Sequence, residues 1–138
     1  MTEKTPATNP TEDDLIKQAK GAQRQAYAPY SNFKVGSAIL TDDGRIFTGC
    51  NVENASYGAT ICAERNAVAA AVCNGARRFQ KIVIVTDQED PVMPCGMCRQ
   101  VLFEFNPDLE IIAVGKTGKR EKATLKDLLP FGFHLEKS

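Results

Sequence analysis

The order of the predicted helices and strands constrains the fold of this chain more than any other sequence feature. Two β-like runs, 33–41 and 45–52, flank Asp42-Asp43-Gly44, which is typical of the turn in a β-hairpin. Two helix–strand pairs follow, at 61–74 with 81–86 and at 94–105 with 110–114. Helices that connect strands of one sheet pack against its faces. The order therefore predicts an α/β fold, a three-layer α/β/α sandwich with a mixed central sheet.

The two ends of the chain frame this core. Residues 1–10 are polar and contain two prolines, so we expect a flexible N-terminal tail before a single domain over 11–138. Thr11 is typical of a helix N-cap and predicts a first helix, which Pro29 would end. Near the other end, a short helix is predicted over 124–129.

The charge balance and the cysteine content exclude several classes of function. Basic and acidic residues both number 17, so the chain lacks the basic excess of proteins that follow a nucleic-acid backbone. It has no apolar run long enough to span a bilayer and no signal-peptide pattern, so we expect a cytoplasmic protein with no membrane or nucleic-acid partner. Five cysteines, an odd number, indicate thiols used for metal binding or chemistry rather than for disulfides.

Three of these cysteines stand where the two crossover helices are predicted to begin. Cys62 opens one helix, and Cys95 and Cys98 lie in the first turn of the other. A helix N-terminus favours the thiolate form of cysteine. If the sheet brings the two helix starts together, three thiolates converge, and three protein ligands with one open position are typical of a catalytic zinc site.

Two other interpretations of the cysteines stay open at this point. The Cys95-x-x-Cys98 pair after a strand also matches a thioredoxin-like redox dithiol. A structural zinc site would need a fourth thiolate, from Cys50 or Cys73. Neither of these begins a helix, and Cys73 is also compatible with a small core residue.

Glu64 favours the catalytic interpretation. It lies two residues after Cys62, in the first turn of the same predicted helix, where its carboxylate can reach a water on the metal without binding the metal. The alternative is an ordinary surface acid attracted by the helix dipole. Arg65, the next residue, is predicted to donate hydrogen bonds to a thiolate, because three thiolates outweigh the charge of one Zn²⁺; the alternative is a surface arginine paired with an acid.

Together these residues resemble the zinc-dependent deaminases of nucleobases, in the variant with three cysteine ligands. More narrowly, the chain is similar to the small homotetrameric cytidine and deoxycytidine deaminases. The likeness spans nearly the whole sequence after the tail and is carried by the blocks 27–31, 33–36, 51–57, 62–65, 94–100 and 128–133. It implies a cytidine deaminase-like fold and the hydrolysis of cytidine and deoxycytidine to uridine and deoxyuridine, with release of ammonia, in pyrimidine salvage.

The resemblance also implies a role for individual residues. Cys62, Cys95 and Cys98 match the zinc ligands, and Glu64 matches the group that moves the protons. The implied substrate contacts are Asn51 and Glu53 with the ribose 3′-hydroxyl, Phe33 beside the base, the Ala63 backbone near the exocyclic amine, the segment Asn54, Ala55, Ser56 and Tyr57 from a neighbouring subunit, and Phe133 stacking across an interface. Phe131 is also aromatic, so the resemblance does not decide which ring stacks.

Several alternatives to this assignment remain. Phe33, Tyr57 and Phe133 each have core packing as the simpler role. The same zinc chemistry could serve an aminonucleoside antibiotic or a nucleotide instead of cytidine. A thiol–disulfide oxidoreductase would use Cys95 and Cys98 without metal, and a metal-stabilised binding module would hold zinc without turnover. The sequence does not rank cytidine against deoxycytidine, and the tetramer rests on the resemblance alone.

Overall fold

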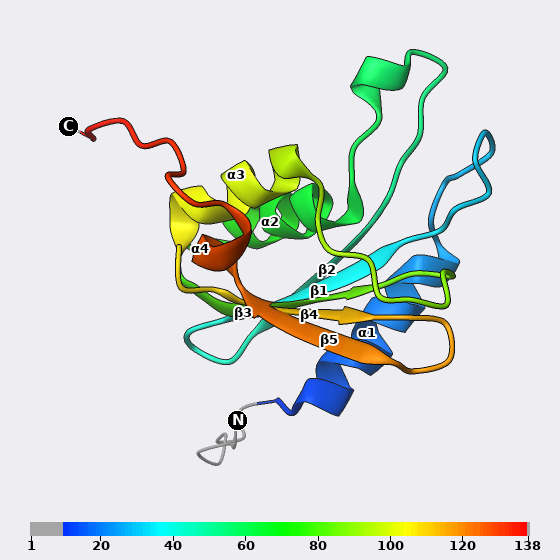
Figure 1. Ribbon diagram of the computed structural model, residues 1–138, viewed down its shortest axis with the longest axis horizontal. Coiled ribbons are helices and arrows are strands. Elements are labelled where there is room, and N and C mark those ends of the chain that lie inside the picture. Colours follow the sequence, from blue (N-terminus) through cyan, green and yellow to red (C-terminus); the bar gives the residue numbers. More distant parts are fainter. Residues whose placement is uncertain (1–9, 138) are drawn as a thin grey trace.

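A computed structural model, which describes residues 10–137, contains a mixed five-stranded sheet (Figure 1). The strand order is β2-β1-β3-β4-β5, for β1 (Gly36–Thr41), β2 (Ile46–Cys50), β3 (Phe79–Val85), β4 (Glu110–Val114) and β5 (Arg120–Thr124). Only β3 and β4 pair in parallel; the other neighbours are antiparallel. The predicted hairpin and mixed sheet are confirmed. Residues 1–9 of the predicted tail lie outside the described residues.

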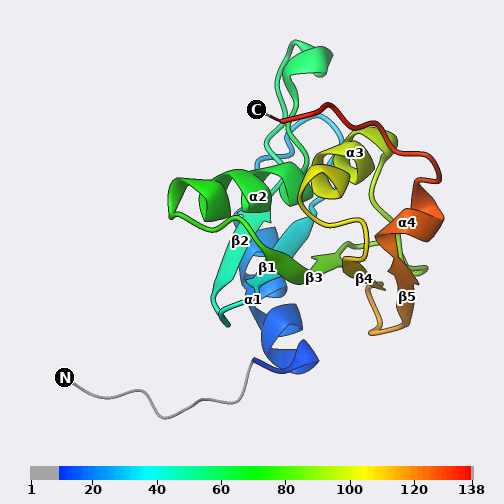
Figure 2. The same ribbon diagram turned by 90° about the vertical axis from the view of Figure 1, so that its left-hand side faces the viewer.

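Helices cover both faces of the sheet, which confirms the three layers. Helix α1 (Glu12–Arg24) packs on one face, and α2 (Ala63–Cys73) and α3 (Gly96–Phe105) lie on the other (Figure 2). Alternate strand residues face the two layers, so that Ile39 contacts the α2–α3 side and Leu40 the α1 side. None of the helices within residues 10–137 has the length and apolar character needed to cross a bilayer.

The ends of two predicted elements differ from expectation for local reasons. The first helix ends at Arg24, not at Pro29, and residues 25–28 continue as irregular chain in which Tyr27 forms a bridge with Val52. The first strand begins at Gly36 rather than at residue 33. Residues 33–35 stay outside the strand, because the Phe33 carbonyl and the Val35 N–H form hydrogen bonds with the Asn51 side chain instead of with a neighbouring strand.

Strand β5 is absent from the sequence prediction, which placed only a short helix near this end. The short helix exists as α4 (Leu125–Leu128), directly after β5. The β5 sequence Arg-Glu-Lys-Ala-Thr has little β-propensity and no apolar alternation. It forms a strand because it pairs with β4 at the sheet edge, where charged side chains are tolerated and discourage further pairing.

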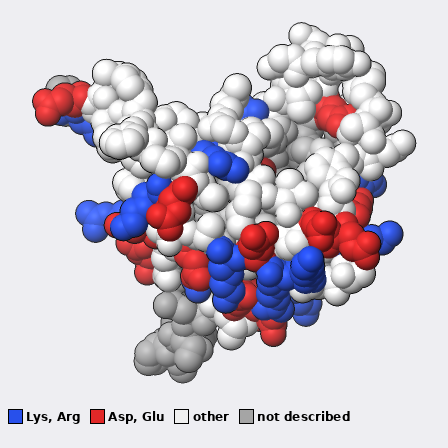
Figure 3. Space-filling model, viewed as in Figure 1, with Lys and Arg blue, Asp and Glu red and all other residues white. Residues whose placement is uncertain are grey.

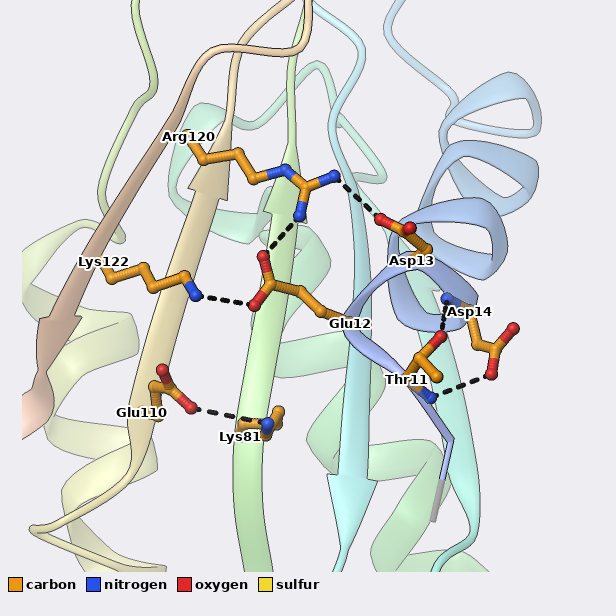
Figure 4. A network of polar contacts seen from close by, with 8 residues as sticks. All are labelled: Thr11, Glu12, Asp13, Asp14, Lys81, Glu110, Arg120 and Lys122. Carbon is orange, nitrogen blue, oxygen red and sulfur yellow. Dashed lines mark hydrogen bonds and ion pairs between the residues drawn. The ribbon is translucent and has the colours of Figure 1, made fainter. Parts of the chain in front are cut away.

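An ion-pair network joins β5 to the start of α1 (Figure 4). Glu12 accepts from Arg120 at 2.6 Å and pairs with Lys122 at 2.8 Å, and Arg120 also reaches Asp13 at 2.8 Å. Thr11 caps the helix as predicted, since its hydroxyl accepts from the Asp14 N–H and its own N–H donates to the Asp14 carboxylate. Exposed pairs stabilise little individually, so the network mainly fixes where α1 begins relative to the edge strand.

Candidate active site

The starts of α2 and α3 meet at one end of the sheet, beyond the carboxyl ends of β2 and β3. Strands β2 and β3 both pair antiparallel with β1, so they run in the same direction and end at the same edge. Helix α2 follows β2 and helix α3 follows β3. Cys62 is the N-cap of α2 and Cys95 the N-cap of α3, each with extended backbone. The topology therefore brings together cysteines that are 33 residues apart.

The sulfur atoms of Cys62, Cys95 and Cys98 all lie within 4.8 Å of one another. The Cys62 and Cys95 sulfurs are 3.9 Å apart. Sulfurs bound tetrahedrally at about 2.3 Å from a zinc ion are roughly 3.8 Å apart, so the spacing fits zinc. Within residues 10–137 no other histidine, cysteine, aspartate or glutamate joins the group, and Cys50 and Cys73 are both free thiols outside it.

Hydrogen bonds and burial shift the pKa values of Cys62 and Cys98 in opposite directions. Hydrogen bonding from Cys98, and then from Arg65 and Cys95, lowers the pKa of Cys62 to about 5. The pKa of Cys98 is raised, first because its hydrogen stays shared with Cys62 and then by burial and by nearby negative charge. Three thiolates in contact repel one another, and a divalent cation between them removes this repulsion.

Glu64 is buried beside the cysteines, with 5% of its surface exposed. Burial raises the pKa of its carboxyl to about 7, and the negative charge of Cys62 acts in the same direction. A cation at the sulfurs would lower this pKa and so favour the ionised carboxylate. Glu64 is not a member of the three-sulfur group, so its carboxylate stands next to the cluster rather than in it.

Arg65 contacts one sulfur of the cluster. Its Nη2 donates to the Cys62 sulfur at 3.7 Å and to the Thr60 carbonyl at 3.4 Å. Its Nε is buried with no hydrogen-bond partner. The pKa of Arg65 is raised, with the Cys62 hydrogen bond as the largest cause. The contact places one positive charge against the thiolates.

A cavity of about 300 Å³ opens in front of the cluster. This volume is at the lower end of the range for small-molecule sites. Of the residues predicted from the sequence, Phe33, Asn51, Glu53, Cys62, Ala63, Glu64 and Cys95 line it. One cavity therefore joins the thiol cluster and the buried carboxylate to an aromatic ring and two polar side chains.

Asn51 and Glu53 are both tied to the chain segment that carries Phe33. The Asn51 amide donates to the Phe33 carbonyl at 2.7 Å and accepts from the Val35 N–H at 2.9 Å. The Glu53 carboxylate accepts from the N–H groups of Tyr30 and Ser31 at 3.0 and 3.1 Å, and from the Ser31 hydroxyl. These hydrogen bonds, that of the Ser31 hydroxyl first, lower the pKa of Glu53.

Other residues predicted to contact a substrate lie outside this cavity. Asn54, Ala55, Ser56 and Tyr57 belong to an arm, residues 53–61, that projects from the body with the 3₁₀-helix η1 (Tyr57–Ala59) at its tip (Figure 1). Tyr57 is 79% exposed and Phe133 63% exposed. Phe131 is fully exposed as well. None of the three aromatics packs in the core, so the simpler alternative for Tyr57 and Phe133 is wrong.

Sequence reasoning missed about half of the cavity wall. The additional lining residues are Val35, Thr60, Ile84, Thr86, Val92 and Met93. Thr86 follows directly after β3, at the sheet edge where the helix starts meet, and this position was readable from the sequence. Val35, Ile84, Val92 and Met93 carry no chemical signal, because apolar lining is indistinguishable from core in a sequence, and Thr60 lies in a polar loop where nothing marks it.

Arg99, which does not line the cavity, has a structural role that the sequence did not reveal. Its Nε donates to the Pro94 carbonyl at 2.7 Å, and its Nη1 donates to the Leu128 carbonyl at 2.9 Å. The next residue, Gln100, exchanges two hydrogen bonds with the Phe133 backbone. The helix that carries Cys95 and Cys98 therefore also holds the C-terminal segment.

Comparison with known proteins gives consistent matches over most of the chain. A family model described as "Cytidine and deoxycytidylate deaminase zinc-binding region" matches residues 10–118. A cytidine deaminase of Sporosarcina psychrophila is 46% identical over 125 residues, which is 90% of this chain and 92% of the relative.

Solved structures and a more distant relative extend these matches. The crystal structure of cytidine deaminase from Burkholderia pseudomallei superposes with a TM-score of 0.86 at 48% identity, over 89% of this chain and 99% of that one. A blasticidin-S deaminase of Bacillus cereus is 36% identical over 107 residues, covering 72% of this chain and 76% of the relative.

Proposed function

Because this chain belongs to the cytidine and deoxycytidylate deaminase zinc-binding family, we propose that it is a zinc-dependent hydrolase that deaminates free cytidine and deoxycytidine in pyrimidine salvage. The observation that carries the proposal is the convergence of three thiols and one buried, unligated carboxylate on a single small cavity. An oxidoreductase would have no use for Glu64, and neither would a structural metal site.

The proposed metal ligands are Cys62, Cys95 and Cys98, which fit zinc in number, spacing and charge. When bound, zinc supplies a Lewis acid that makes water a nucleophile at neutral pH. We assign proton movement to Glu64. Its carboxylate takes a proton from the attacking water as the C4–O bond forms, and delivers this proton to N3 of the ring. It then takes the remaining proton of the new C4 hydroxyl and passes it to the departing amine, so that a carbonyl forms at C4. One water is consumed, the C4–N4 bond breaks, and uridine and ammonia leave.

The cavity lining supports a nucleoside as the substrate. In the proposed pose Phe33 lies beside the base, the Ala63 backbone near the amine, and Asn51 and Glu53 at the 3′-hydroxyl. Glu53 also limits the size of the substrate, because its carboxylate would repel a phosphate attached at that position. Single-stranded DNA and nucleoside 3′-phosphates should therefore be excluded.

We also infer a homotetramer with active sites shared between subunits. The arm at 53–61 is uncharged except for Glu53, and the tail at 129–134 carries no acidic or basic residue except His134. Figure 3 shows these parts largely free of charge, whereas charged side chains gather along the opposite, lower side. The exposed apolar side chains Tyr57, Phe131 and Phe133 support an interface there, with Phe133 or Phe131 stacking in a neighbouring site.

The domain boundary and the compartment are part of the same proposal. We propose a single deaminase domain over 11–138, and the family match over residues 10–118 supports where it starts. Five cysteines without a disulfide agree with a reducing, cytoplasmic environment.

A direct assay tests the proposed function. Purified protein should convert cytidine to uridine, followed by ultraviolet absorbance, with about one zinc per chain, and should lose this activity on chelation and regain it with zinc. Cytidine 3′-phosphate and single-stranded DNA should give no turnover. Blasticidin S belongs in the same panel, since the relative from Bacillus cereus bears that substrate's name. Zinc without turnover of cytidine would contradict the proposal, and so would turnover that survives metal removal.

Replacing Arg65 tests its proposed role in offsetting thiolate charge. Arg65→Ala should preserve the fold while weakening zinc binding and turnover, by about 10–100-fold as found for groups that contact metal ligands. The physical reason is the lost positive charge at the Cys62 sulfur. Zinc affinity by competition with a chelator and steady-state kinetics measure the effect. The exposed Arg24, on α1, provides the matched control Arg24→Ala, and equal behaviour of the two variants would remove Arg65 from the mechanism.

A further inference from the structure

Ser31 connects two parts of the proposed substrate site. Its hydroxyl donates to the Glu53 carboxylate, and the same oxygen accepts from the Phe33 N–H at 3.0 Å. Its own N–H donates to Glu53 at 3.1 Å. Ser31 thus touches the acid assigned to the sugar and the main chain that carries the aromatic ring assigned to the base.

The hydrogen bonds of Glu53 leave little of its carboxylate free. Two carboxylate oxygens offer about four acceptor positions. Oε1 takes the N–H groups of Tyr30 and Ser31, and Oε2 takes the Ser31 hydroxyl. One acceptor position of Oε2 therefore remains free. The Ser31 hydroxyl sets the direction of this position, because it occupies the other acceptor position of the same oxygen.

The hydrogen-bonding groups of the Asn51 amide are also mostly occupied. Its Oδ1 is occupied by the Val35 N–H, and one of the two Nδ2 hydrogens by the Phe33 carbonyl. One N–H donor of Asn51 and one acceptor position of Glu53 therefore remain beside the same cavity. A donor next to an acceptor is the complement of a single hydroxyl group, which both donates and accepts.

We propose that Ser31 is a positioning residue for the site that binds a sugar hydroxyl. It orients the free acceptor of Glu53 and holds the Phe33 backbone, and so determines how strongly the enzyme prefers a substrate that carries this hydroxyl. This inference rests on the proposed function and adds to it the group that prepares the hydroxyl site. Without the Ser31 hydroxyl, Oε1 of Glu53 stays held by two backbone N–H groups, but Oε2 has no partner that fixes its direction, and the Phe33 N–H loses its partner. The chemistry at Glu64 is left intact.

The experiment compares two substrates that differ in that hydroxyl. Ser31→Ala should lower kcat/KM for cytidine about tenfold or more, since hydrogen bonds to charged groups are the stronger kind. On 3′-deoxycytidine, which lacks the hydroxyl, the same change should cost less than about threefold. The loss on cytidine should lie mainly in KM, because the hydroxyl is held in the ground state as well as the transition state. Ser31→Thr, which keeps a hydroxyl, should restore the discrimination.

A second pair of variants tests the link from the side of the acid. On a Glu53→Gln background the charged partner of Ser31 is gone, so Ser31→Ala should add little to the loss already caused by Glu53→Gln. The matched control is Thr117→Ala, an exposed hydroxyl in the turn between β4 and β5, which should leave both substrates unaffected.

The outcomes separate this inference from the proposed function. Equal losses by Ser31→Ala on cytidine and 3′-deoxycytidine would show a purely structural role and overturn the inference, as would additive losses in the double variant. Both leave the deaminase proposal standing. Failure of the unchanged chain to deaminate cytidine would instead refute the proposed function, and the assignment of Ser31 with it.

Discussion

Glu64→Gln is expected to remove nearly all turnover of cytidine while zinc stays bound. The amide has the size of the carboxyl group but neither accepts nor releases a proton in the working pH range. Loss of well-placed general acid–base catalysis typically costs about 10²–10⁴-fold in rate. Because Glu64 stands outside the three-sulfur group, the metal ligands are unchanged. Kinetics and zinc stoichiometry on the same preparation measure the two effects.

The position of Glu64 makes this result specific. The side chain is 5% exposed, and its carboxyl has a raised pKa, so its replacement by an uncharged amide should not unfold the protein. Glu121→Gln, at an exposed position on β5, is the matched control and should behave as the unchanged chain. Loss of zinc from Glu64→Gln would identify Glu64 as a ligand, and undiminished turnover would assign the proton transfers to another group.

Gly49→Ala should destabilise the protein and disable the site together. A Cβ at position 49 would lie 2.4 Å from both the Ala63 carbonyl oxygen and the Ala67 nitrogen. These are backbone atoms of α2, which cannot move aside like a flexible side chain. The added methyl group must therefore push the helix start away from β2, and Cys62, Glu64 and Arg65 move with it.

The expected size of this effect is large for a single methyl group. Overpacking costs about 1–3 kcal/mol, and backbone clashes belong at the upper end. For a domain of this size, 3 kcal/mol corresponds to a decrease in Tm of about 10 °C. A displacement of about 1 Å at reacting groups costs around 10²-fold in rate. Thermal unfolding and kinetics of the variant check both numbers.

Gly21 provides the control for Gly49. It lies within α1, and the nearest atom to an added Cβ is Arg24 Nη2 at 3.8 Å. Gly21→Ala should raise stability by about 0.5–1 kcal/mol, because alanine restricts the unfolded chain and favours the helix. A Gly49→Ala variant with the Tm of the unchanged protein would mean that α2 and β2 are not packed as closely as described.

The fold could be predicted where one segment carries a strong local pattern. The hairpin turn at 42–44, the buried strand β3 and the helices that follow Cys62 and Cys95 all have such patterns. The fifth strand could not be predicted in this way. Its residues 120–124 are charged, and only the exposed backbone of β4 beside them makes that segment a strand.

In the candidate site, too, residues with a local signal could be predicted and residues placed by distant parts of the chain could not. The cysteines, Glu64 and Arg65 were found because each has distinctive chemistry at a helix start. The apolar part of the cavity wall was missed, because Val35 and Ile84 are indistinguishable from core residues until the cavity is seen. The hydrogen bonds that tie Asn51 and Glu53 to the Phe33 segment were also invisible, since they join side chains to backbone groups of a distant part of the chain.

The sequence by itself determined the identity of the reactive groups and the helix starts on which they stand, because side-chain chemistry and helix signals are local properties. Only the tertiary structure decided that Cys62 meets Cys95 and Cys98. That meeting depends on β2 and β3 running in the same direction beside β1, so that both following helices begin at one sheet edge. The tertiary structure likewise decided that Glu64 is buried, since its environment is built by segments far away in the chain.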